Sequence, residues 1–180
     1  TNAGGPGVMT ADSVIAEGGK LAKLDQKTID QLNKVLPPFW SRGNPIDILG
    51  DAQTDRYEAV LNACIKDENI DGILIIYTPQ GVADPGKIAK NIVQILKKTR
   101  SKKPILTSFM GHEEVEEGNK ILNQNSIPTY STPEQAVKTY MYMRQYSRNL
   151  EMLYQTPAEL PVDSVPPRRP INVIIKDAAK

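Results

Sequence analysis

Apolar residues recur with helical spacing in several segments of this chain, and other apolar segments lack that spacing. The helical pattern predicts helices around 8–15, 29–36, 57–65, 88–96 and 136–141. Residues 72–77 form an unbroken apolar run, which is typical of a strand buried on both faces of a parallel sheet. Residues 104–109 predict a second buried strand, and residues 21–22 and 127–130 predict shorter ones.

Residues that cap or break helices lie at the ends of the helical segments. Gly18-Gly19 ends the first pattern, and Pro37-Pro38 stops the second. The later patterns are preceded by capping side chains or by a proline suited to the first helical turn: Asp25, Thr54, Asp84-Pro85 and Thr132-Pro133. The chain therefore alternates helices and strands.

This alternation predicts an α/β fold, a flavodoxin-like doubly wound parallel sheet in a three-layer α/β/α arrangement with strand order 2-1-3-4-5. No strand precedes the glycine-rich start, so we expect the first strand to be truncated at the chain start. Such sheets bind ligands at the carboxyl ends of their strands, beside the point where the strand order reverses. We expect residues 3–7 and the turns after Tyr77 and Phe109 at these carboxyl ends, which together form the rim of the sheet.

Composition divides the chain into two parts. Residues 1–155 carry the alternating pattern and are expected to form the flavodoxin-like domain. Proline and charged residues dominate 156–170, as in an extended linker, and residues 171–180 look like the beginning of a further region. The sequence therefore predicts a domain over 1–155 and a linker over 156–180.

The overall composition narrows the classes of function. The 22 basic and 21 acidic residues nearly cancel, which gives no support to a nucleic-acid or membrane partner. The single Cys64 excludes an internal disulfide and fits a reducing compartment, and no apolar run approaches membrane length, so we expect a cytoplasmic protein. Because His112 is the only histidine, we expect neither a histidine-based metal cluster nor a Cys/His dyad. The basic residues of 97–103 follow a helical pattern without interleaved aromatics, which indicates a solvated helix end.

The first seven residues carry the clearest candidate site. Gly4, Gly5 and Gly7 leave backbone amides unshielded by any Cβ, and Pro6 suits the first turn of a helix. A glycine-rich loop that opens onto a helix start collects free N–H groups and the positive end of the helix dipole, which favours phosphate binding. The loop matches neither the nucleotide P-loop nor the dinucleotide fingerprint, so a tight turn that merely requires glycine is the alternative.

Other polar or aromatic residues allow both a structural and a functional interpretation. Asp47 and Asp51 suit turn or cap positions, or they face a partner domain. Phe39-Trp40 suits packing, or one ring lines a pocket. His112 follows a predicted strand and is either a catalytic base or phosphate acceptor, or a helix-start residue. The helix-start interpretation is favoured, because no carboxylate or serine is placed to orient the imidazole.

Several separate motifs occur in an order that resembles the ADP-forming acyl-CoA synthetases, relatives of succinyl-CoA synthetase. The resemblance covers about residues 1–146 and rests on these segments: Thr1-Asn2-Ala3-Gly4-Gly5-Pro6-Gly7-Val8, Asn44-Pro45-Ile46-Asp47 with Gly50-Asp51-Ala52, Thr78-Pro79-Gln80, Met110-Gly111, and Ile127-Pro128-Thr129-Tyr130 with Thr132-Pro133-Glu134. Residues 171–180 resemble the lead-in to an ATP-grasp region.

The resemblance implies a specific reaction. Such enzymes interconvert an acid, CoA and ATP with an acyl-CoA, ADP and phosphate through an acyl phosphate and a phosphohistidine. This chain would be their flavodoxin-like domain, whose first helix faces the phosphohistidine together with a second helix start. The phosphorylated histidine belongs to a preceding domain, so this fragment would hold no catalytic residue and would be inactive alone. His112 stands where relatives have Met-Gly-Gly, which gives it no support as that histidine.

The resemblance also implies roles for residues of the loops. Gly4, Gly5 and Gly7 would hold the phosphoryl group while Asn2 fixes the loop, and Asp47, Gln80 and Gly111 are interface or pocket candidates. The full enzyme would use CoA, ATP or ADP, phosphate, and magnesium held by an absent domain. Its partners would be the preceding CoA-binding and histidine-bearing domains, the following ATP-grasp domain and a small organic acid, in an oligomer.

A second hypothesis places the chain in a different class. A related module is joined to a lysine acetyltransferase domain in some bacterial proteins, where it resembles a regulatory unit that binds CoA or acyl-CoA. A free-standing flavin or receiver module is disfavoured, because the loop lacks the hydroxyl-rich flavodoxin pattern and no acidic cluster with a matching lysine marks a receiver.

Overall fold

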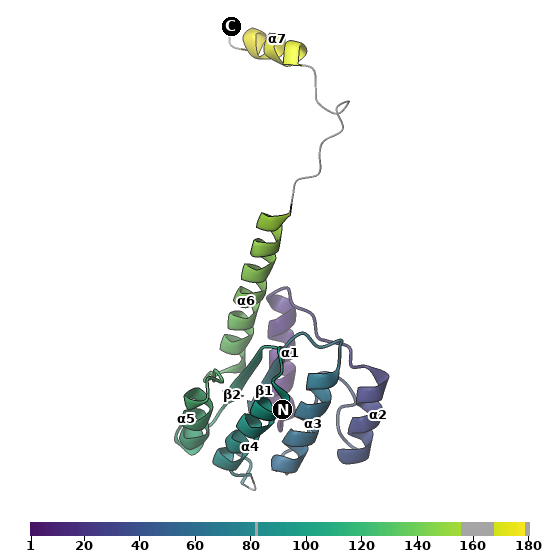
Figure 1. The fold of residues 1–180 in the computed structure, drawn as a ribbon, viewed down its shortest axis with the longest axis vertical. Helices are drawn as coiled ribbons and strands as arrows, with labels where there is room; N and C mark the ends of the chain where they lie inside the picture. Colours follow the sequence, from purple (N-terminus) through teal and green to yellow (C-terminus); the bar gives the residue numbers. More distant parts are fainter. Residues whose placement is uncertain (82, 156–167, 179–180) are drawn as a thin grey trace. The chain divides into compact units, whose positions relative to one another are not determined.

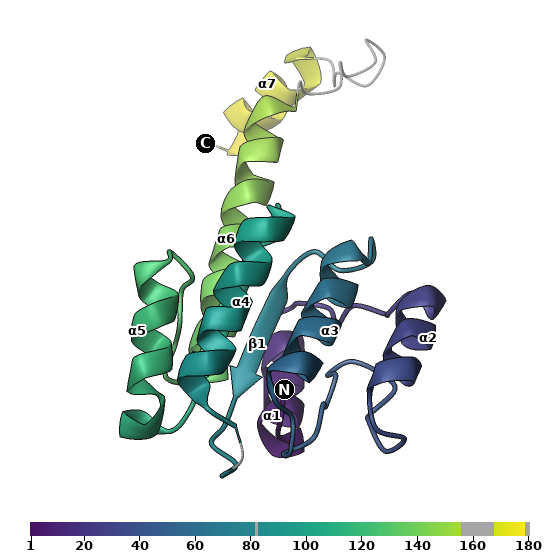
Figure 2. The ribbon, with the colours of Figure 1, turned by 60° about the horizontal axis from the view of Figure 1, so that its bottom comes forward.

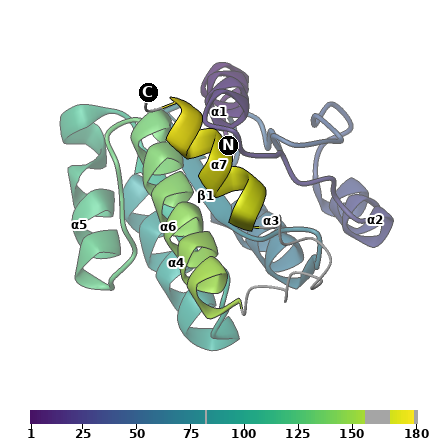
Figure 3. The ribbon, with the colours of Figure 1, turned by 90° about the horizontal axis from the view of Figure 1, so that it is seen from above.

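The computed structural model describes residues 1–81, 83–155 and 168–178 in two units, 1–145 and 146–180. The first unit has a parallel sheet between helices (Figure 1). Its elements, in chain order, are α1 (Gly4–Ala16), α2 (Gln26–Val35), α3 (Thr54–Lys66), β1 (Ile73–Tyr77), α4 (Pro85–Thr99), β2 (Ile105–Phe109), η1 (His112–Val115), α5 (Glu116–Gln124) and the start of α6 (Pro133–Tyr154). Figures 2 and 3 show α3 and α4 on one side of β1 and α1 on the other.

The sheet is smaller than the sequence predicts. β1 and β2 pair in parallel from Ile73 opposite Ile105 to Tyr77 opposite Phe109, and Thr129 joins β2 through a single bridge to Thr107. The described residues thus form a mixed α/β fold with a small parallel sheet. The complete wound sheet with order 2-1-3-4-5 is not formed by them.

Local chemistry explains why two of the predicted strands are shorter or absent. In segment 127–130, the Thr107 N–H donates to Pro128 O at 2.9 Å and the Tyr130 N–H donates to Thr107 O at 2.9 Å. Pro128 has no N–H to continue the ladder, so the pairing stops after one bridge. Residues 21–22 are not a strand, and Ala22 O accepts a hydrogen bond from the Asn44 side chain at 3.1 Å instead.

Most predicted helix boundaries are confirmed. Asp25 accepts from the Lys27 N–H at 2.8 Å and Asp84 accepts from the Lys87 N–H at 3.0 Å, so both carboxylates cap helices as expected. The expected cap Thr54 is wrong by one residue, because Gln53 is the N-cap and makes no side-chain capping bond. His112 begins η1, which confirms its interpretation as a helix-start residue.

One apolar core joins the odd-numbered strand positions to the helices α2 to α5. Tyr77 and Phe109 are buried with their ring centroids 5.0 Å apart, and the Tyr77 hydroxyl donates to Ala83 O at 2.8 Å. Cys64 is buried in this core, and burial raises the pKa of its thiol to about 11, so the thiol stays protonated near neutral pH. Cys64 is therefore a packing residue.

The second unit contains the end of α6 and the helix α7 (Arg168–Ala178). Residues 156–167 of the predicted linker lie outside the described residues. The linker over 156–180 stays a prediction, and within it residues 168–178 form α7. Among the described residues, no helix is long and apolar enough to cross a membrane.

Asp67 links the end of α3 to the start of α2. Its side chain is 3% exposed and accepts from the N–H groups of Asp25 and Asn69, both at 2.9 Å. Burial raises the pKa of Asp67, but hydrogen bonds from Asp25, Thr28 and Asn69 outweigh this effect and hold the pKa below its ordinary value. The ionised form therefore stabilises the fold.

We predict that Asp67→Ala lowers the free energy of unfolding by about 1–3 kcal/mol, because buried N–H groups lose their acceptor. Urea unfolding near neutral pH measures the change, with the exposed neighbour Glu68→Ala as the control expected within about 0.5 kcal/mol of the parent. A lowered carboxyl pKa stabilises fully above the ordinary pKa and loses its effect as pH falls through the lowered value. The difference in free energy of unfolding between the parent and Asp67→Ala should therefore decrease in acid. A difference that does not depend on pH would contradict the stabilising role of the ionised Asp67 carboxylate.

Candidate functional site

The carboxyl end of β1 gathers loops that are distant in sequence. In Figure 2 the β1 arrow points to the end of the unit where the amino terminus and the start of α1 lie. Residues 44–51, 78–81 and 110–112 surround the same rim, as the following contacts show. The structure therefore brings the predicted site residues together.

Asn2 fixes the amino-terminal loop to the end of β1. Its side chain is 1% exposed, and its Nδ2 donates to Thr78 O at 2.8 Å while its Oδ1 accepts from the Thr78 N–H at 2.9 Å. The Thr78 hydroxyl also donates to Asn2 Oδ1 at 3.2 Å. Because Thr78 engages both the oxygen and the nitrogen of this buried amide, Asn2 holds the amino-terminal loop against the end of β1.

The glycines of the loop have different environments. The Gly7 N–H donates to Ala3 O at 3.3 Å as the first bond of α1, and a Cβ at Gly7 would lie 2.9 Å from Thr1 Cγ2. Gly7 therefore permits close packing and has no free N–H for a ligand. Pro6 has no N–H, so Gly4 and Gly5 carry the free N–H groups of the first turn among the described residues.

The space around these two N–H groups is asymmetric. Both glycines are exposed, and a Cβ at Gly5 would meet no atom within 4 Å. A Cβ at Gly4 would lie 2.9 Å from Asp47 Oδ2, so the Asp47 carboxylate borders this end of α1. The Oδ1 atom of Asp47 accepts from the Leu49 N–H at 2.9 Å, which holds the carboxylate in place. The rim thus offers two donors with an anionic acceptor beside one of them.

The other two interface candidates lie on the loops that follow the strands. A Cβ on Gly50 would be 3.1 Å from Gln80 Oε1, so Gln80 borders the loop that carries Asp47. Gly111 has a φ of +146°, and a Cβ there would be 2.5 Å from Pro79 Cγ. The turns after β1 and β2 therefore touch, and only glycine fits at position 111.

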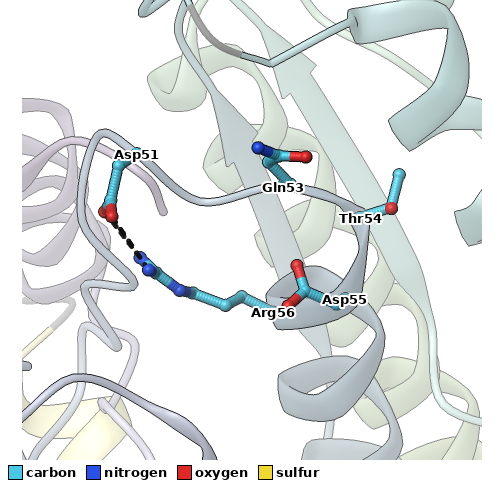
Figure 4. A pocket seen from close by; sticks show the side chains of 5 residues that line it. All are labelled: Asp51, Gln53, Thr54, Asp55 and Arg56. Carbon is cyan, nitrogen blue, oxygen red and sulfur yellow. Dashed lines mark hydrogen bonds and ion pairs between the residues drawn. The ribbon is translucent and has the colours of Figure 1, made fainter.

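Asp51 has a structural partner. Arg56 donates to both carboxylate oxygens of Asp51, at 2.6 and 2.9 Å, and to Ile48 O at 3.0 Å (Figure 4). The hydrogen bonds from Arg56 lower the pKa of Asp51. A shallow hollow at the start of α3 is lined by Asp51, Gln53, Thr54, Asp55 and Arg56. The ion pair ties the loop to α3, and we assign no chemistry to this hollow.

Thr78 and Pro79 make contacts at the rim that the sequence did not predict. Thr78 holds Asn2, and Pro79 packs against Gly111. The only sequence signal was their place in the segment Thr78-Pro79-Gln80 directly after a predicted strand. His112 is exposed next to this turn, and among the described residues no group of three or more His, Cys, Asp or Glu side chains could hold a metal ion.

A small parallel sheet with a glycine-rich helix start beside the carboxyl end of β1 defines a mixed α/β domain. The model of the Ligase-CoA domain family matches residues 1–153. The chain belongs to the Ligase-CoA domain family.

Relatives of known name agree with this family. The chain is 35% identical over 153 residues to the acetate–CoA ligase (ADP-forming) II subunit alpha of Pyrococcus furiosus, covering 83% of this chain and 33% of that one. It is 40% identical over 149 residues to the acetate–CoA ligase (ADP-forming) of Methanocaldococcus jannaschii, covering 82% and 21%. The apo structure of the dinucleotide-forming acetyl-coenzyme A synthetase 1 of Candidatus Korarchaeum cryptofilum matches with a TM-score of 0.77 at 34% identity, covering 86% of this chain and 34% of that one.

The chain spans about a fifth to a third of the length of these relatives. These homologues are ADP-forming CoA ligases, and the chain corresponds to a fragment of them. They give no support to the hypothesis of a regulatory module in a lysine acetyltransferase.

We predict that Asn2→Ala lowers the free energy of unfolding by about 2 kcal/mol, because the N–H and C=O of Thr78 lose their partner. Asn44→Ala is the matched control, since exposed Asn44 makes one hydrogen bond, to Ala22 O, and we expect a loss below about 1 kcal/mol. Chemical denaturation of both variants measures the difference. Equal losses would show that Asn2 does not hold the loop.

A second prediction concerns the amino group of Thr1. This group is buried and donates to Ile46 O at 3.0 Å, and burial lowers its pKa from 8.0 to about 6, although the Asp47 carboxylate opposes the shift. Between these values the unfolded chain binds a proton that the folded chain does not, so stability rises as pH rises from about 6 to about 8. The gain is on the order of 2 kcal/mol.

Thermal unfolding of the 180-residue chain with a free Thr1 amino group measures this gain across that window. Acetylation of Thr1 is the control, because it removes the titrating group. We expect the stability of the acetylated chain no longer to rise between about pH 6 and about pH 8 because of this group. If stability rises with pH as steeply as before acetylation, another group causes the rise.

Proposed function

We propose that this chain is a domain of an ADP-forming acyl-CoA synthetase, which converts an acid, CoA and ATP into an acyl-CoA, ADP and phosphate. Within that enzyme, the start of α1 stabilises a phosphohistidine carried by another domain. The family and the names of the relatives support the reaction class, and the geometry of the rim supports the role of α1.

The free and exposed N–H groups of Gly4 and Gly5 are the observation that carries this role. They lie at the positive end of a 13-residue helix, and Asn2 holds that end at the rim. A phosphorylated side chain carries about two negative charges near neutral pH. A helix start stabilises such an anion by a few tenths to about 2 kcal/mol, depending on burial.

The residues around the helix start suit contact with another domain. Gln80 and Gly111 are exposed on adjoining turns, and Asp47 borders Gly4. We assign these three residues to the surface that receives the histidine-bearing domain. Asp47 limits how closely an anion approaches Gly4, so we expect the anion to sit nearer Gly5.

The remaining parts of the reaction belong to other domains in this proposal. CoA, the nucleotide, magnesium and the small organic acid bind to the CoA-binding, histidine-bearing and ATP-grasp domains of the same or a partner chain. The contribution of this chain is a fixed pair of N–H donors, which requires no rearrangement when the charged group arrives.

Gly5→Val in a full-length ligase containing this domain tests the role of α1. A Cβ at Gly5 would meet no atom within 4 Å, so we expect the fold to tolerate the change. The bulk of valine beside the free N–H groups should hinder the approach of the phosphoryl group, and we expect about a tenfold loss of phosphohistidine. Ala16→Val is the matched control, because Ala16 is exposed at the far end of the same helix. Acid-labile phosphoenzyme formed from radiolabelled ATP is the measurement, and thermal unfolding verifies the fold.

Unchanged phosphoenzyme in Gly5→Val would exclude the start of α1 as the phosphate cradle. The reaction class has a separate test, which is ATP formation from ADP and phosphate with a panel of short acyl-CoAs. ATP with one of them would establish the ligase and identify its acid. Absence of ATP with every acyl-CoA, in folded protein with magnesium, would overturn the ligase assignment.

A further inference from the structure

The end of α6, residues 146–154, carries a largely exposed apolar face. Tyr146, Leu150, Leu153 and Tyr154 follow one another at helical spacing, so their side chains lie on one side of the helix. Tyr146 is 66% exposed, Leu153 79% and Tyr154 86%, and Leu150 is half-buried. Large apolar side chains that gather in this way on one face mark an interaction site.

The helix α7 has an apolar face of its own. Ile174 and Ala178 are four residues apart and Ile175 and Ala178 are three apart, which places all three on one side of the helix. Ile174 is 66% exposed and Ile175 is 61% exposed. A helix of 11 residues is only marginally stable alone in water, so α7 needs a surface to pack against.

The apolar face of the α6 end meets that need within the same unit of the chain. This unit, residues 146–180, contains both the end of α6 and α7. At about 1.5 Å per residue, the α6 face and α7 have similar lengths of roughly 12 and 16 Å. The connecting residues 155–167 can span up to about 40 Å, which lets α7 return to α6. An antiparallel arrangement brings the positive start of α7 to the negative end of α6.

A second copy of the chain is the competing occupant of the α6 face. The face is shorter than two heptads, whereas a coiled coil between chains sustains its apolar spacing over at least about three or four heptads. α7, in contrast, is joined to α6 covalently. The entropic cost of closing a loop grows only with the logarithm of its length, and a tether keeps the two helices at a high effective concentration. These arguments favour α7 of the same chain.

We propose that α7 packs antiparallel against the apolar face of the α6 end, with Ile174 beside Leu150 and Ala178 beside Tyr146. Steps of four residues along both helices keep these two pairs in register when the helices run in opposite directions. The product is a helical hairpin in the second unit. α7 lies beyond residues 1–153, which the family model matches, and the hairpin does not depend on the proposed enzymatic reaction.

Two pairs of neighbouring residues supply matched variants of the 180-residue chain. Ile174→Asp introduces a charge into the proposed contact, whereas Val173→Asp introduces the same charge on the other side of α7, at a side chain that is 58% exposed. In the same way, Leu153→Asp alters the apolar face of α6, and Met152→Asp alters its opposite side.

Amide hydrogen exchange, measured residue by residue with NMR, reports the packing. We expect Ile174→Asp to speed exchange at Leu150 and Leu153 by about tenfold or more, and Val173→Asp to leave it within about twofold of the parent. Leu153→Asp should likewise speed exchange at Ile174, whereas Met152→Asp should not. Equal effects of the two variants within either pair would overturn the proposal.

Nuclear Overhauser contacts in the parent chain give a second, independent measurement. We expect contacts between the methyl groups of Leu150 and Ile174, and between the Tyr146 ring and the Ala178 methyl group. Absence of both contacts would overturn the proposal, and a contact between Tyr154 and Ala178 in their place would overturn the antiparallel direction. In a mixture of isotope-labelled and unlabelled chains, contacts that form only between different chains would show that a second copy supplies the partner helix, and would overturn the choice of occupant.

Discussion

The rim of this domain depends on one set of hydrogen bonds, those between the Asn2 side chain and the backbone of Thr78. They join the start of α1 to the end of β1, two points 76 residues apart. With α1 fixed there, the N–H groups of Gly4 and Gly5 are held at the carboxyl end of the strands. The close approach of Gly7 to Thr1 and Pro45 then brings the loop of Asp47 against the same helix start.

The rim presents the exposed backbone of Gly4 and Gly5, with the Asp47 carboxylate beside Gly4. The chain corresponds to a fifth to a third of its relatives, so the groups that complete a reaction belong to other parts of such proteins in our proposal. Preorganised donors are useful in that setting, because they stabilise an arriving charge without reorganisation.

Much of the fold could be predicted from sequence because the signals are local. Asp25 and Asp84 cap helices through N–H groups two and three residues away, and residues 73–77 form a buried strand because they are uniformly apolar. Predictions failed where a partner elsewhere decided the outcome. Pro128 limits segment 127–130 to one bridge only because its missing N–H faces β2, and residues 21–22 are not a strand in the described structure.

The sequence alone shows the glycine-rich start, the helix that follows it and the order of the motifs along the chain. These features suffice to identify the family and to predict an anion site at a helix start. Sequence could not distinguish the glycines from one another. Only the packed structure shows that Gly7 is used inside α1, that Gly5 faces open space and that Asp47 borders Gly4. The reason is physical: backbone propensity and capping act over a few residues, whereas a free N–H is defined by what distant segments place beside it.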